Sequence, residues 1–356
     1  MKKFKQSSLL NIGIVIVLVF AGLAISNLCL LDYYVRIINL IGINIILVAS
    51  LNLTNGFTGI FSMGHAGFMA VGAYVSALLT MSAAQKSAML PNLPGWLSAV
   101  QMPFLPALLT AGILTALCAV VIGFPTLRLK GHYLTVATLG FLVIIRVLLT
   151  NMESITRGAR GISGLPAYTD SWWVYSIVIL TLYILWRVIH SAYGRSMISI
   201  REDQTAAQAL GIRLRFNRLL AFCMGAFFAG IGGALWGHLM TVISPNFFSY
   251  SQTFSLVEIS IIGGMYSLTG AVAGSIVMTI VPELLRSLEG GINLFGYVTP
   301  PLSGLSQIIT AILFIILIIV RPQGIMGFKD FHPGRFLEAL SQAVSKLLRH
   351  TGKTLA

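Results

Sequence analysis

The stretch Tyr193–Asn217, YGRSMISIREDQTAAQALGIRLRFN, is a long polar run between two strongly apolar halves of the chain. Within it, the residues from Asp203 to Ala209 are good helix formers behind an acidic start. Asp203 suits the first position of such a helix because its carboxylate caps free N–H groups and offsets the helix dipole. Gly211 suits the position just after the end. The stretch therefore predicts a short surface helix.

The predicted helix has a small apolar face. Ala206, Ala207 and Leu210 recur at helical spacing, so they share one side. A knob of this kind fits a socket on another protein, whereas the alternative is an ordinary loop between two membrane spans. Charge pairing around the socket is expected from Arg201, Glu202 and Asp203, and Gly211 gives the sharp turn that follows.

The composition excludes a soluble protein. Hydrophobic residues make up 56% of the chain and charged residues 9%, with a mean hydropathy of +0.89. Soluble domains carry about 25% charged residues. The net charge of +13 is expected in cytoplasmic loops, not on a nucleic-acid surface. The chain is predicted to be an all-α integral membrane protein, a bundle of about 8–10 transmembrane helices with broken or re-entrant segments.

Apolar runs divide the chain into spans. Runs about long enough to cross a bilayer cover approximately Leu9–Leu31, Val35–Leu51, Gly59–Met81, Ala107–Phe124, Tyr133–Thr150, Trp172–Ile189, Leu219–Thr241 and Leu302–Val320. Phe254–Leu285 is too long for one crossing of a ~30 Å core. Two short helices joined near Tyr266–Gly270 are predicted there instead.

The distribution of basic residues predicts the orientation. Most of the 23 Lys and Arg residues fall in the amino tail, Pro125–His132, the central group from Arg187 to Arg218 and the carboxyl tail. The positive-inside rule then places these segments and both termini in the cytoplasm. Residues 1–328 are expected to form the membrane domain, with 193–217 as its cytoplasmic loop. Residues 329–356 are expected to form an amphipathic tail, helical over Arg335–Arg349.

Polar residues and glycines interrupt the run from Asn52 to Gly67. Such groups are tolerated at membrane depth only against protein or a water-filled cavity. The candidate residues of a solute path are Asn52, Asn55, Ser62, Gly64, His65 and Gly67. The alternative is close helix packing through small residues and interhelical hydrogen bonds. Glu258 is an acid within a span, which suggests function, but a solvated or paired position near the outer interface is the alternative.

Several catalytic signatures are missing from the sequence. No G-x-x-x-x-G-K-[ST] loop occurs, so ATP binding through a Walker site is not expected on this chain. No zinc, paired-carboxylate or nucleophile pattern is found either. We therefore predict a transporter subunit and not an enzyme, with no cofactor or metal of its own. A secondary transporter or a channel for small solutes remains an alternative, although the few membrane acids speak against ion coupling.

Three motifs resemble those of one permease family. They are Asn52–Phe68 (NLTNGFTGIFSMGHAGF), Tyr193–Arg195 with Ile200–Asp203, and Arg321–Gly324 (RPQG). They resemble the LivM-type permease subunits of branched-chain amino-acid ABC importers, over approximately Ile37–Gly327. Urea and short-chain amide importers share this permease class and are the alternative.

The resemblance implies an assembly in the bacterial inner membrane. It implies a LivH-type second permease, two cytoplasmic ATPase subunits that bind ATP and Mg, a periplasmic binding protein, and leucine, isoleucine or valine as solute. Such permeases carry a docking loop resembling E-A-A-x-x-x-G, which Ala206, Ala207 and Gly211 match. Thr205 stands where that pattern has Glu.

Overall fold

The computed structural model describes residues 17, 20–129, 131–289, 293–294, 297–298 and 304–327. Two compact units divide the chain, one made of residues 36–328 and the other of residues 1–35 with 329–356. A helix over Phe20–Cys29 is described in the predicted first span. The expected tail helix Arg335–Arg349 falls outside the described residues.

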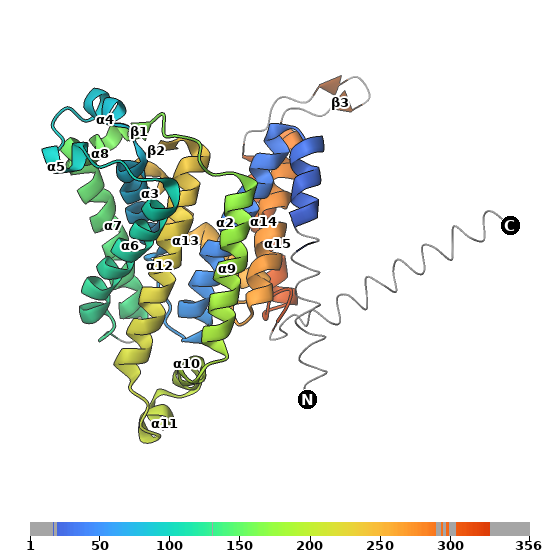
Figure 1. The fold of residues 1–356 in the computed structure, drawn as a ribbon. Helices are drawn as coiled ribbons and strands as arrows, with labels where there is room; N and C mark the ends of the chain where they lie inside the picture. Colours follow the sequence, from blue (N-terminus) through green and yellow to red (C-terminus); the bar gives the residue numbers. More distant parts are fainter. Residues whose placement is uncertain are drawn as a thin grey trace. The chain divides into compact units, whose positions relative to one another are not determined.

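Helices make up most of the described chain (Figure 1). They are α2 (Asp32–Asn52) with a π-helical turn (Leu53–Phe57), α3 (His65–Thr80), α4 (Ala83–Met89), α5 (Gly95–Ser98), α6 (Phe104–Thr126), α7 (His132–Asn151), α8 (Glu153–Thr156), α9 (Ser171–Ile189), α10 (Ala192–Glu202), α11 (Gln204–Ala209), α12 (Leu214–Met240), α13 (Tyr250–Gly263), α14 (Leu268–Glu289) and α15 (Leu305–Val320). Single 3-10 turns cover Gly158–Arg160 and Pro245–Phe247. Strand β1 (Ile162–Ser163) pairs antiparallel with β2 (Val242–Ile243), and β3 (Asn293–Leu294) with β4 (Tyr297–Val298).

The described helices confirm a polytopic helical membrane protein. By length and hydropathy, 6 of them can cross a membrane: Asp32–Phe57, α6, α7, α9, α12 and Leu268–Arg286 of α14. The apolar helices Phe20–Cys29 and α15 are shorter, and α3 meets α4 at a bend of 118°.

Two broken segments were predicted, and the structure defines both. Residues 254–285 form two helices, α13 and α14, separated at Gly264, whose φ is +114°. The predicted split is confirmed, with the break at residues 264–267, slightly earlier than the expected Tyr266–Gly270. The predicted span Gly59–Met81 needs correction, because helix α3 begins only at His65. The six preceding residues are non-helical, and they let the Asn55 side chain bond the backbone of Ser62.

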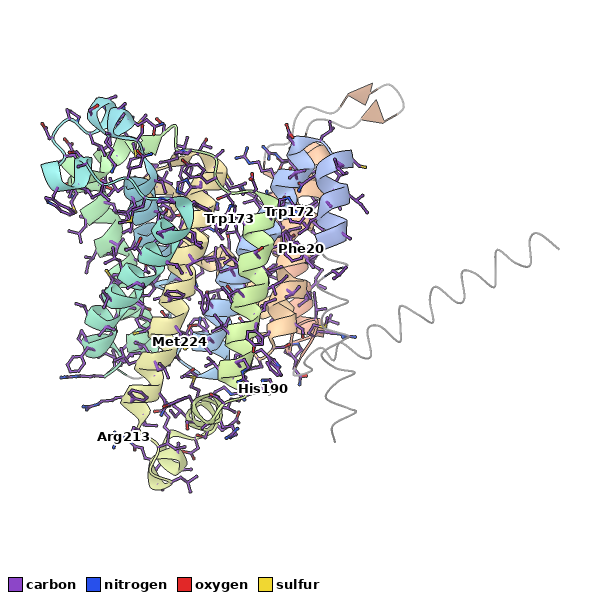
Figure 2. The ribbon with its side chains drawn as sticks, viewed as in Figure 1. Phe20, Trp172, Trp173, His190, Arg213 and Met224 are labelled. Carbon is purple, nitrogen blue, oxygen red and sulfur yellow. The ribbon has the colours of Figure 1, made fainter. Side chains whose placement is uncertain are left out.

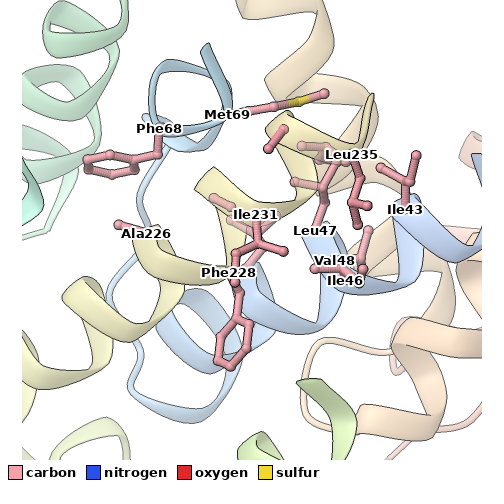
Figure 3. Packing of buried hydrophobic residues seen from close by; sticks show 14 of the residues in the cluster. Ile43, Ile46, Leu47, Val48, Phe68, Met69, Ala226, Phe228, Ile231 and Leu235 are labelled. Atoms are coloured by element: carbon pink, nitrogen blue, oxygen red, sulfur yellow. The ribbon is translucent and has the colours of Figure 1, made fainter. Parts of the chain in front are cut away.

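Helix α12 lies at the centre of the core, packed against α3 and α6. Figure 3 shows its Phe228, Ile231 and Leu235 among the buried side chains of α2 and α3. The backbones approach closely because glycines face each other. A Cβ atom on Gly72 of α3 would lie 2.1 Å from the carbonyl oxygen of Gly230. A small-residue seam of this kind is how membrane helices gain packing energy.

Substituting Gly72 by valine is therefore expected to destabilise the core. Its side chain has no space, so α3 and α12 must separate, and overpacking costs about 1–3 kcal/mol or more. Gly140→Val on α7 is the matched control, because nothing lies within 4 Å of a Cβ atom there. Thermal unfolding in detergent should show a lower midpoint for Gly72→Val only; equal midpoints would refute the seam.

The two ends of the 36–328 unit differ in structure. Helices α10 and α11 lie at one end, and α4, α5, α8 and the β1–β2 pair lie at the other (Figure 1). At the α4 end, the Lys86 side chain is buried. Its ammonium donates to the carbonyls of Leu97, at 2.9 Å, and Val100. Burial lowers the pKa of Lys86. Its hydrogen bonds hold the following loop onto α4.

Candidate coupling surface and solute path

The polar stretch folds as two short helices between α9 and α12. Figure 2 labels His190, where the chain leaves α9, and Arg213, where it enters α12. The Asp203 carboxylate accepts the N–H groups of Thr205 at 2.7 Å and Ala206 at 3.1 Å. Gly211 follows α11 with a φ of +80°, a conformation that glycine adopts without strain. The predicted helix, its cap and its terminating glycine are confirmed.

The apolar face of α11 needs correction. Leu210 is 79% exposed and Ala206 is exposed, but Ala207 is only 1% exposed. Helix α11 lies against α12. Ala207 is buried within this chain, so it is unavailable to a partner. The outward apolar surface consists of Ala206 and Leu210, and its role in docking stays a prediction.

Arg201 also differs from its expected position at the rim of a docking surface. Its side chain is 20% exposed, against 67% for Glu202, with which it forms an ion pair. Its guanidinium donates to the carbonyl of Gly56 at 3.4 Å and lies 4.7 Å from the ring centre of Tyr266. Arg201 therefore connects α10 to the turn after α2 and to the break between α13 and α14.

The break between α13 and α14, residues 264–267, is called the α13–α14 junction below. The Asn52 amide donates to the carbonyls of Gly264 at 3.4 Å and Ser267 at 3.2 Å, and its oxygen accepts the Ser260 hydroxyl. Gly56 lies so close that a Cβ atom there would be 1.8 Å from the Met265 carbonyl oxygen. Only glycine fits at this contact.

The R-P-Q-G motif after α15, together with the two residues that follow it, reaches the same junction. The N–H groups of Ile325 and Met326 donate to the carbonyls of Ile262 at 2.8 Å and Gly263 at 3.2 Å. These bonds satisfy carbonyls at the end of α13 that have no partner within the helix. Gly324 has a φ of +76° and approaches the Gly264 backbone closely. All three motifs singled out in the sequence thus meet at the α13–α14 junction.

The polar residues predicted to line a solute path bond within this chain. The Asn55 amide pairs with the Ser62 backbone, accepting its N–H at 3.0 Å and donating to its carbonyl at 3.1 Å. His65 Nε2 lies 2.9 Å from the Ser50 hydroxyl. The side chains of Asn52, Asn55, Ser62 and His65 are all buried. They stabilise the non-helical segment before α3, and their part in a solute path stays a prediction.

Gly64 and Gly67 lie where α3 meets α7. A Cβ atom would be 3.1 Å from the Thr138 carbonyl oxygen at Gly64, and 3.1 Å from the Phe141 ring at Gly67. The Phe68 and Phe141 rings pack beside them, with centroids 4.9 Å apart. Both glycines therefore serve helix packing, so a bulky residue there would disturb the fold as well as any path.

Glu258 was considered either as a functional acid within a span or as a solvated or paired residue near the outer interface. It lies in the body of α13 and is partly buried. Within the described ranges, no hydrogen bond or ion pair reaches its carboxylate. It is thus neither paired nor at the end of its helix.

The sequence predicted a break near Tyr266–Gly270 but not that Arg201 and the other motifs meet there. The Gly263-Gly264 pair marked the irregular backbone but not its partners. The described residues hold no group of three or more His, Cys, Asp or Glu side chains able to bind a metal. The arrangement suits the transmission of movement from α10 to two broken helices.

Comparisons with known proteins agree with the motifs. The family described as branched-chain amino acid transport system, permease component, matches residues 33–320. The chain is 29% identical to the high-affinity branched-chain amino acid permease protein LivM of Escherichia coli K12, over 82% of this chain and 69% of that protein. It is 25% identical to LivH of the same organism, over 76% and 87%. The probable LivM of Methanocaldococcus jannaschii is 23% identical, over 81% and 91%.

Proposed function

The chain belongs to the permease components of branched-chain amino acid transport systems, and we propose that it moves leucine, isoleucine and valine inward as the LivM-type subunit of an ATP-driven importer. The observation that carries the coupling part of the proposal is the position of Arg201. It joins the exposed α10–α11 segment to both broken helices. The solute is proposed from the names of the related permeases.

In the proposed assembly this chain contacts four kinds of partner. A LivH-type permease pairs with this chain, which is supported by the likeness to both LivM and LivH of one organism. Two ATPase subunits hold ATP and Mg, and one of them docks at Ala206 and Leu210 of this chain. A periplasmic binding protein delivers the solute to the α4 end, and lipid covers the exposed apolar helices.

The α10–α11 end is proposed to be cytoplasmic. Arg195, Arg213 and Arg215 lie there, and excess basic charge marks cytoplasmic segments. Both termini are proposed to lie on the same side, in the bacterial inner membrane.

Transport follows from movement at the α13–α14 junction. Closure of the ATPases displaces α10–α11, and Arg201 carries this displacement to the Gly56 turn and to Tyr266. In many transporters interrupted helices form the solute site, and alternating access moves one helix bundle against another around that site. The solute site then opens toward the cytoplasm instead of the periplasm.

Uptake in cells tests the solute. A strain that lacks this gene is compared with the complemented strain for uptake of labelled leucine, isoleucine, valine, urea and acetamide. The proposal expects loss of aliphatic amino-acid uptake only. Selective loss of urea or amide uptake would support the related permeases instead, and unchanged amino-acid uptake would refute the proposed solute.

A further inference from the structure

One face of α13 is polar and uncovered. Ser251, Ser255 and Glu258 are spaced i, i+4 and i+7, so they share one side of the helix. The two serines are exposed and Glu258 is partly so, whereas Thr253, Leu256, Val257 and Ser260 on the other side are buried. Ser251, Ser255 and Glu258 together are called the polar face of α13.

Helix α13 packs beside two apolar segments, the candidate span Asp32–Phe57 and the helix α3. The Thr253 hydroxyl oxygen accepts the N–H of Ala66 at the start of α3, and the Ser260 hydroxyl donates to Asn52 at the end of α2. Glu258 comes between these two contacts in the chain. It also lies eight residues after Tyr250, about 12 Å along the helix. Glu258 therefore lies in the body of α13, on a helix that contacts the end of α2 and the start of α3, both in apolar, span-like segments.

A carboxylate beside apolar, span-like segments needs a compensating partner. Facing lipid, it would carry a large free-energy cost, and membrane acids almost always face a bundle interior or a water-filled cavity. In the part of the chain that the structure describes, no side chain bonds Glu258, Ser251 or Ser255. The residues that the structure describes supply no such partner for the Glu258 carboxylate.

We propose that the polar face of α13 lines the solute path and that the Glu258 carboxylate binds the ammonium group of the amino acid. This assignment rests on the proposed function. An amino acid leaving water carries an ammonium group that requires an opposite charge, and Glu258 supplies one. The Ser251 and Ser255 hydroxyls donate to its carboxylate as it passes. Phe254, 49% exposed beside them, offers an apolar surface for the aliphatic side chain.

Cysteine accessibility tests the path without reference to any solute. Ser255→Cys is introduced into the assembled importer, in a background whose three native cysteines are replaced and which still transports. A charged, membrane-impermeant thiosulfonate should label it. Ile144→Cys on α7, an apolar site 59% exposed, is the lipid-facing control and should stay unlabelled. Equal labelling of the two, or none at Ser255→Cys, would overturn the path.

Substitution of Glu258 tests the binding role. Glu258→Gln removes the charge at constant shape and is expected to lower leucine uptake at least tenfold in proteoliposomes holding the whole importer. Glu258→Asp should retain uptake within a few-fold, because it keeps the charge. Glu153→Gln, an exposed acid of α8 at the α4 end, should have no effect.

Further measurements separate this proposal from the alternatives. Unchanged uptake in Glu258→Gln overturns the binding role. Loss of the second permease on purification also overturns it, since Glu258 would then be an ion pair between subunits. If the unsubstituted importer moves no aliphatic amino acid, the proposed function fails instead, and labelling at Ser255→Cys still reports on the path.

Discussion

Arg201→Ala is expected to lower solute-driven ATP hydrolysis and uptake at least tenfold while the ATPase subunits remain bound. The guanidinium is the described link from α10 to both the Gly56 carbonyl and the Tyr266 ring. A charged hydrogen bond contributes about 1.5–3 kcal/mol and a cation–π contact about 0.5–2 kcal/mol. A tenfold effect needs about 1.4 kcal/mol, so losing both contacts suffices.

Two variants sharpen the Arg201 experiment. Arg195→Ala, on the same helix, removes a cation that donates to the His190 carbonyl at 3.2 Å, and it should transport normally. Arg201→Lys keeps the charge but loses the planar guanidinium that donates a hydrogen bond and stacks on the ring. An intermediate rate of ATP-driven uptake is therefore expected. Normal coupling in Arg201→Ala would show that the contact with the α13–α14 junction carries no movement. Co-purification of the ATPases checks that assembly is intact.

Leu210→Asp is expected to release the ATPase subunits from the purified assembly. Leu210 is 79% exposed at the end of α11, beside Ala206, and these two residues form the outward apolar surface. A charge placed in a packed socket loses its hydration without a partner. Central interface residues contribute about 2 kcal/mol or more, which corresponds to roughly a thirtyfold weaker complex.

The control for Leu210→Asp lies on the opposite side of the same helix. Gln208 is exposed but faces away from Ala206 and Leu210, so Gln208→Glu adds the same charge without entering the socket. It should retain the ATPases at high and low salt. Equal retention in Leu210→Asp would mean that α11 is a solvated helix that does not dock an ATPase. Ala207→Arg is a different experiment, because Ala207 is buried within this chain and its substitution disturbs α11 itself.

Local patterns predicted the elements well. The cap at Asp203, the positive φ at Gly211 and the split of residues 254–285 follow from neighbouring residues, and all three are confirmed. The start of α3 was predicted too early. Its position depends on the pairing of the Asn55 amide with the Ser62 backbone, a contact that hydropathy does not contain.

Residue roles that depend on distant contacts were not predictable. The sequence pattern placed Ala207 and Leu210 on the same face of the helix. Packing of α11 against α12 buries Ala207 and leaves Leu210 exposed. Likewise, Arg201 looked like a rim charge, but its partners lie 145 residues before it, at Gly56, and at Tyr266 on the second broken segment. The spacing of residues along the sequence does not predict such contacts between distant segments.

The most direct test of an ATP-driven importer is reconstitution. The chain, its second permease and the ATPases are placed in proteoliposomes, and labelled leucine with the binding protein is supplied on the side of the α4 end. The account predicts uptake that requires both ATP and the binding protein, and that an imposed ion gradient cannot replace. Uptake without ATP, driven by such a gradient or by the leucine gradient alone, would contradict it and indicate a secondary transporter or a channel.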